Sequence, residues 1–266
     1  GEQKSSFLQN LGQEYEIVRE RVANRQPLKP ALDYTEALQR RFQPNWTEYT
    51  PAKPTFLGTK AIEVPLVDLV AYIDWTPFFL TWELAGKFPA ILQDEVVGEQ
   101  AQLLYQDARM MLEQMVAAEW ATGKAAVGFW PAASRGDDIL VYTDDTRTKV
   151  KEVLHQVRQQ ANPGDESKPT YSLADFLPPE ENTLQDYIGG FCVTTGHGID
   201  ERAKAYEAEG DDYNSIMIKA LADRLAEALA EYMHEKVRKT LWGYATDETL
   251  NNVQLIKEQY QGIRPA

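Results

Sequence analysis

The chain has 266 residues, of which 43% are hydrophobic and 26% are charged, and these shares are typical of a folded globular protein. Its net charge of −14 argues against nucleic-acid and anionic-membrane partners, because an acidic surface repels phosphate groups. No membrane-spanning run or signal peptide is visible, and the single cysteine, Cys192, excludes an intramolecular disulfide framework, so we expect a cytoplasmic protein.

Hydrophobic spacing predicts a helix over 7–24, followed by a proline-rich stretch with a short helix over 33–41. The stretch 62–89 combines a short strand with one or two short helices, in which Pro77 suits a first turn and Gly86 a C-terminal end. A long amphipathic helix is expected over 97–120. Two strands, 125–131 and 139–142, then form a hairpin around the turn 134–138.

The second half of the chain returns mainly to helical spacing. Helices are expected over 146–160, 199–207, 212–239 and 248–259, with one more strand over 187–194. Because strands are few and do not alternate regularly with helices, the pattern favours an α+β fold with an antiparallel sheet. We expect 1–45 to form a helical arm or linker on the main body and 46–266 to form one domain.

The spacing of residues argues against a metal site, a phosphate-binding loop and a nucleophilic catalytic site. The three histidines, His155, His197 and His234, are not spaced as metal ligands with one another or with the cysteine. No Walker phosphate loop or dinucleotide-binding glycine motif is present, and no nucleophile–base pair can be identified. The sequence therefore predicts neither a metal site nor a catalytic residue.

An aspartate in an aromatic segment is the first candidate binding residue. Five aromatic side chains lie between Trp75 and Phe88, a density that is itself typical of a buried core. Asp74 adjoins them, and a carboxylate beside bulky apolar groups needs a partner. It could cap the helix that begins near Pro77, or it could bind the ammonium of an amino-acid-like ligand.

Two further charged features allow both a structural and a functional interpretation. Arg264, between a glycine-containing turn and a proline, suits bidentate binding of a carboxylate, although it could also be a surface residue near a frayed end. Four acidic residues recur every fourth position of the helix over 212–239, namely Asp223, Glu227, Glu231 and Glu235. This ridge is either a solvated helix face or a surface that faces a cationic ligand or partner.

At these residues the sequence resembles the C-terminal activation domain of vitamin B12-dependent methionine synthase. The resemblance begins near residue 46 and rests on a set of motifs that is specific only as a whole. The motifs are YIDWTPFF over 72–79, DEVVG over 94–98, GFWPA over 128–132, GDDI over 136–139, LADF over 173–176, DYIG over 186–189, DDYN over 211–214, KALADRLAE over 219–227, HE over 234–235 and YQGIRPA over 260–266.

The resemblance implies a C-shaped α+β domain with a bent antiparallel sheet and a groove for S-adenosylmethionine. In such enzymes this domain docks on a separate cobalamin domain, where an electron from flavodoxin or a flavoprotein reductase and a methyl group restore methylcobalamin. Carried over by motif, the ligand contacts would be Asp74 and Arg264. Asp223 and Glu227 fall where the long helix of the family approaches the ligand or the cobalamin. The chain would thus be a non-autonomous domain of a cobalamin-dependent 5-methyltetrahydrofolate–homocysteine methyltransferase, acting in methionine biosynthesis.

One departure from the family pattern bears on ligand affinity. Members of the family continue after Arg-Pro-Ala with Pro-Gly-Tyr-Pro and a long region that supplies a further ligand contact, whereas this sequence ends at Ala266. The alternative function is therefore a docking module that contacts the cobalamin domain or the reductase and binds S-adenosylmethionine weakly or not at all.

Overall fold

A five-stranded antiparallel sheet organises this computed structural model, which describes residues 2–23, 31–162, 164–165, 167–250, 254–255, 257 and 259–262. The strands are β1 Gly58–Val64, β2 Gly123–Arg135, β3 Asp138–Tyr142, β4 Val150–His155 and β5 Asp186–Thr194. The long strand β2 pairs with β1 and β5, and its end pairs with β3, beyond which β4 extends the sheet. The predicted α+β class with an antiparallel sheet is confirmed.

Helices pack on one face of this sheet and form the main core with it. The α-helices are α1 Glu2–Ala23, α2 Tyr34–Gln39, α3 Leu66–Leu69, α4 Thr76–Thr81, α5 Gly98–Ala117, α6 Ile199–Ala208 and α7 Asp212–Lys236. Short turns of helix are η1 Val70–Tyr72, η2 Ala90–Gln93 and η3 Leu173–Phe176, and a π-helical segment, η4 Val237–Leu241, directly continues α7. The apolar stripe of α7 is buried against Val127 and Phe129 of β2 and against α3, α4 and α5, as its helical spacing predicts.

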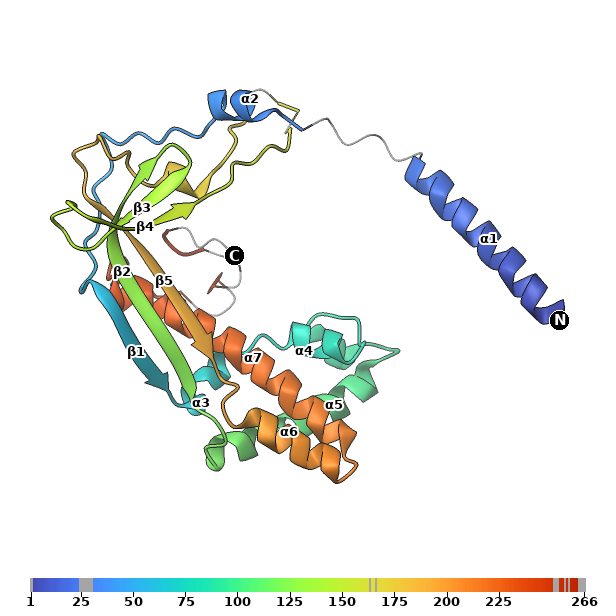
Figure 1. Ribbon diagram of the computed structural model, residues 1–266. Coiled ribbons are helices and arrows are strands. Elements are labelled where there is room, and N and C mark those ends of the chain that lie inside the picture. The colour runs from blue at the N-terminus through green and yellow to red at the C-terminus, as the bar shows by residue number, and fades with distance from the viewer. Residues whose placement is uncertain are drawn as a thin grey trace.

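Figure 1 shows how these elements bend the molecule into a C. The upper end holds α2, β3 and β4, the lower end holds α4, α5 and α6, and the curled sheet with α7 joins them. Helix α1 extends away from this body, and its described side chains beyond Leu11 are exposed. The predicted C-shaped architecture is therefore present.

The predicted helix over 146–160 is wrong, because this stretch forms strand β4. Val150 and Val153 are β-branched residues that fit a pleated strand, and β4 finds an antiparallel partner in β3, where Leu140 lies opposite Val153. Apolar spacing alone could not separate the two structures, since tertiary pairing decides such short segments.

Gly86 also has a different role from the predicted helix end. Helix α4 stops at Thr81, and the left-handed residue after it is Glu83, with a φ of 60°. A Cβ on Gly86 would lie 2.8 Å from Cγ1 of Ile91, so glycine is needed there for close packing.

The two ends of the chain are described only in part. Five of the twelve residues of the predicted helix over 248–259 lie outside the described residues, and of the others only Gln254 and Leu255 are helical. Residues 32–42 are joined to the upper end, since Leu32 N–H donates to the Gln160 carbonyl and Phe42 N–H to the Thr170 carbonyl, while a domain boundary at residue 45 stays a prediction. Among the described helices, none is both long and apolar enough to cross a membrane.

Candidate functional site

The aromatic side chains next to Asp74 belong to the main core. Trp75 is 7% exposed, and Phe78 and Phe79 are fully buried. Trp75 meets Phe78 and Tyr105 edge to face, with ring centroids 5.4 and 4.9 Å apart. The aromatic rings of this segment therefore form a buried core, as their density predicted, and only Asp74 remains a candidate binding residue.

Asp74 lies on the surface between η1 and α4, both of which pack against α7. One carboxylate oxygen accepts a hydrogen bond of 2.9 Å from the backbone N–H of Thr76, the first residue of α4. This bond satisfies one free donor of the helix start, so a local capping role is present. A carboxylate has about four acceptor positions, and this single bond leaves most of them open to a ligand.

The acidic ridge on α7 separates into an exposed part and a bonded part. Asp223 and Glu227 are exposed, and Asp223 forms an ion pair with the neighbouring Arg224. The Glu227 side chain makes no hydrogen bond or ion pair with another residue in the described ranges. Glu235, at the other end of the ridge, is largely covered and accepts bonds from Tyr72 and Lys239. Only the first two residues are therefore placed to meet a ligand or partner.

Glu235 connects α7 to the segment that carries Asp74. The hydroxyl of Tyr72 donates to Glu235 Oε2 at 2.6 Å, and the Tyr72 ring lies edge-on to Tyr232, 5.5 Å between centroids. Burial raises the pKa of the Glu235 carboxyl, but the bonds from Tyr72 and Lys239 outweigh it and hold the pKa below its ordinary value. Glu235 is therefore an ionised structural partner of the residue two positions before Asp74.

Arg238, in η4, forms a second buried contact. Its side chain, 1% exposed, donates two bonds of 2.6 Å to the Glu248 carboxylate. A third N–H donates to Nδ1 of His234 at 2.7 Å, which requires that nitrogen to be unprotonated. The guanidinium also lies over the ring of Tyr260, 4.6 Å from its centroid. Arg238 therefore binds Glu248 and Tyr260, which follow it along the chain.

Arg264 lies outside the described residues, so its predicted role stays a prediction. The nearest described residue before it is Gly262, whose φ of 97° is in the left-handed region. A Cβ there would meet the hydroxyl oxygen of Tyr244 at 2.9 Å. Both the conformation and the space thus require glycine two residues before Arg264.

A cavity of about 630 Å³ in the described part of the chain is lined by residues other than Asp74, Asp223 and Glu227. Aromatic side chains line it, among them Trp46, Tyr49 and Trp242. Its buried carboxylate, Asp186, has a pKa that burial raises despite bonds from Tyr187 N–H and the Tyr49 hydroxyl at 2.9 Å. Because this carboxylate already has protein partners, the cavity is a weaker ligand candidate than the exposed carboxylates around α7.

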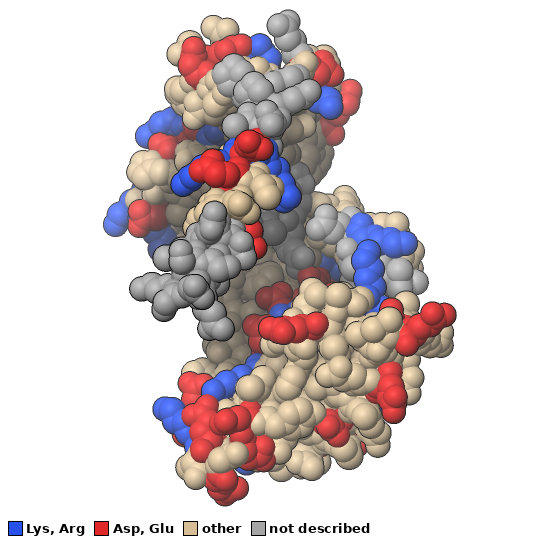
Figure 2. All heavy atoms as spheres, turned by 90° about the vertical axis from the view of Figure 1, so that its right-hand side faces the viewer, with Lys and Arg blue, Asp and Glu red and all other residues tan. Residues whose placement is uncertain are grey.

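The open side of the C is hollowed between its two ends. Figure 2 looks into this hollow and shows acidic side chains on the otherwise largely uncharged surface of the lower end. Within the described ranges, no group of three or more histidine, cysteine or acidic residues is placed to hold a metal ion. The face is suited to a cationic organic group or a protein surface.

Two comparisons with known proteins show what this chain is similar to. The sequence model of a family described as "Vitamin B12 dependent methionine synthase, activation domain" matches residues 65–266. A crystal structure of the MetH reactivation domain bound to AdoHcy superposes with a TM-score of 0.85 at 50% sequence identity. That match covers 90% of this chain and 73% of the other chain.

Proposed function

This chain belongs to the family of activation domains of vitamin B12-dependent methionine synthase, and from that premise we propose that it binds S-adenosylmethionine for methyl transfer to a cobalamin held by a separate domain. As a member of that family it is part of a methyltransferase. The observation that carries the proposal is the AdoHcy-bound reactivation domain, which is 50% identical over 90% of this chain. AdoHcy is S-adenosylmethionine without the transferred methyl group.

The proposed ligand contacts are an ammonium on Asp74 and a carboxylate on Arg264. The carboxylate of Asp74 has open acceptor positions on the surface, and a charge-assisted hydrogen bond fits there. Glu227, exposed on the adjacent helix α7, is proposed as a further contact with the ligand, and Asp223 as a contact with the ligand or the cobalamin face. These four assignments rest on motif positions and on the placement of the three described residues.

The proposed chemistry needs no general base in this chain. The sulfonium of S-adenosylmethionine would supply an already activated methyl group to the cobalamin, with one electron from the proposed reductase and with AdoHcy as the leaving product. The residues here have only to bind the amino-acid end and orient the ligand, which is a positioning task. The scarcity of histidine and the lack of a nucleophile–base pair in the sequence are compatible with such a task.

The proposed partners are the cobalamin domain of the same enzyme and a flavodoxin or flavoprotein reductase, in the cytoplasm. Acidic residues on the face shown in Figure 2 favour a basic patch on whichever partner docks there. Such docking would weaken as ionic strength rises, because exposed charges are screened by salt.

Calorimetric titration with S-adenosylmethionine tests the ligand assignment. Wild type is compared with Asp74→Asn and Arg264→Ala, and each variant should bind roughly 10- to 100-fold more weakly, as expected for loss of a charge-assisted bond. Unchanged affinity in both variants would overturn the assignment. Salt-sensitive binding to a cobalamin domain without any S-adenosylmethionine binding would favour the docking-module alternative.

A further inference from the structure

The junction of α7 and η4 contacts two tyrosines that precede the proposed clamp residues, Tyr72 before Asp74 and Tyr260 before Arg264. We infer that Glu235 and Arg238 are positioning residues: Glu235 fixes the segment of Asp74, and Arg238 fixes the segment that leads to Arg264. The inference rests on the proposed function, which supplies the ligand, while the contacts are those of the structure. It assigns a binding role to residues that touch no ligand themselves.

The first connection runs through Tyr72. Its hydroxyl bonds Glu235 at 2.6 Å, and Asp74 follows two residues later. The residue between them, Ile73, is 5% exposed and belongs to the main core. The backbone before Asp74 is therefore held by a polar contact to α7 and by burial, which leaves the carboxylate little freedom to move.

The second connection runs through Tyr260. Arg238 holds Glu248 by two bonds of 2.6 Å and lies over the Tyr260 ring at 4.6 Å. The same ring meets His234 of α7 edge to face at 4.8 Å. Arg264 lies four positions beyond Tyr260 along the chain. The described part of this segment is thus anchored on the same turn of helix as the Asp74 segment.

The partner choice of Glu235 and Arg238 distinguishes this arrangement from an ordinary helix-surface pair. Opposite charges three residues apart on a helix can bond each other. Here the π-helical turn begins between them, at Val237. Glu235 pairs with Lys239 one turn further on and also bonds Tyr72, whereas Arg238 bonds Glu248. Such turns often occur at functional sites, because the extra residue changes where following side chains point.

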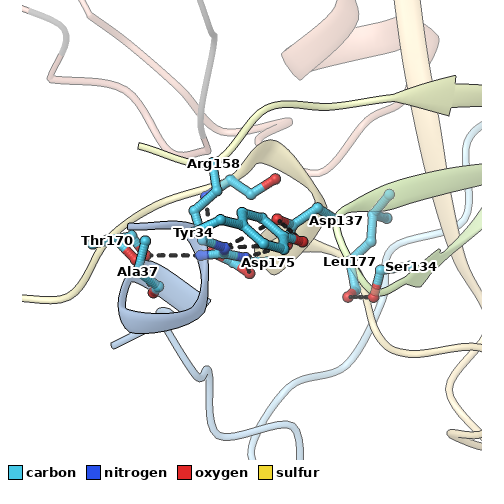
Figure 3. A network of polar contacts seen from close by, with 9 residues as sticks. Tyr34, Ala37, Ser134, Asp137, Arg158, Thr170, Asp175 and Leu177 are labelled. Carbon is cyan, nitrogen blue, oxygen red and sulfur yellow. Dashed lines mark hydrogen bonds and ion pairs between the residues drawn. The ribbon is translucent and has the colours of Figure 1, made fainter. Parts of the chain in front are cut away.

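A matched set of contacts exists elsewhere in the molecule and provides the control. Figure 3 shows Arg158, fully buried, between the carboxylates of Asp137 and Asp175, with the hydroxyl of Tyr34 bonded to Asp137 at 3.1 Å. This network joins α2, the β2–β3 turn and η3 at the upper end of the C (Figure 1). It repeats the tyrosine–carboxylate and arginine–carboxylate chemistry without contacting either clamp segment.

The test is a set of double-mutant cycles read by titration of the full chain with S-adenosylmethionine. Tyr72→Phe and Arg238→Lys should each weaken binding about tenfold, the size expected for coupled groups in contact. Tyr34→Phe and Arg158→Lys, the matched controls, should leave the affinity within about twofold while they lower thermal stability. Circular dichroism at the titration temperature verifies that each variant is folded, and Tyr260→Leu replaces Arg238→Lys if that variant is not.

The decisive result comes from combining each of these substitutions with Asp74→Asn and with Arg264→Ala. The effect of Tyr72→Phe should vanish in Asp74→Asn but persist in Arg264→Ala, and the effect of Arg238→Lys should show the opposite dependence. Additive effects in both backgrounds, or losses no larger than those of the controls, would overturn the inference. Failure of the proposed function is distinguishable, because Asp74→Asn and Arg264→Ala alone would then leave the affinity unchanged.

Discussion

Substitutions in the segment from Asp74 to Phe79 should affect ligand binding and stability separately, because the aspartate is exposed and the aromatic rings are buried. Phe79 is fully buried and packs near Phe78, Phe88 and Tyr105 at centroid distances of 5.5, 6.3 and 6.4 Å. Truncating such a side chain to alanine removes its transfer free energy and leaves a cavity, which together cost about 3–5 kcal/mol. For a chain of this size that loss corresponds to a fall in Tm of roughly 6–20 °C.

Asp74→Asn is the matched substitution in the same segment. Its amide oxygen can still accept from Thr76 N–H, so we expect a stability change within about 0.5 kcal/mol together with the loss of ligand affinity proposed above. The assay is thermal and urea unfolding of both variants beside wild type. A Tm of Phe79→Ala within about 2 °C of wild type, or a larger fall in Tm for Asp74→Asn than for Phe79→Ala, would contradict these roles of the two residues.

Three further outcomes follow from other contacts. Arg158→Ala should cost about 3–5 kcal/mol in urea unfolding, because it leaves two buried carboxylates without a counter-ion. Gly262→Ala should lower S-adenosylmethionine affinity in a titration, since its left-handed φ and the contact with Tyr244 must both change, whereas Gly136→Ala, also left-handed but in open space, should not. The pKa of Glu235 is lower in the folded protein than its ordinary value of 4.5, so its ionised form stabilises the fold fully above about pH 4.5. This stabilisation is lost as the pH falls through the lowered pKa. Glu235→Gln should therefore make the free energy of unfolding less dependent on pH in the acid range.

Long amphipathic helices were the most predictable part of the fold. The spacing of Met217, Leu221, Leu225 and Met233 placed α7 almost to the residue, because such a stripe has to face a core. Strand β4 was not predictable in the same way. Its identity depends on an edge offered by β3, and pairing between separate segments leaves no periodic pattern in a stretch of six residues.

In the candidate site, too, features formed by neighbouring residues were predictable and contacts between distant residues were not. The motif around Asp74 and its place at a helix start could be read from neighbouring residues. The bonds from Tyr72 to Glu235 and from Arg238 to Glu248 could not, since the first joins residues 163 positions apart and the second depends on how the chain turns after η4. Helical spacing predicted only that Glu235 lies on an acidic face of the helix, whereas the tertiary structure shows that it is half-buried and bonded to Tyr72.

A crystal structure of this chain with S-adenosylmethionine bound would show whether Asp74 and Arg264 hold the amino-acid end of the ligand. We expect the ligand ammonium within about 3 Å of the Asp74 carboxylate and the ligand carboxylate paired with the guanidinium of Arg264. A ligand seated instead in the aromatic cavity beside Trp46 and Asp186, with Asp74 bonded only to Thr76, would contradict it.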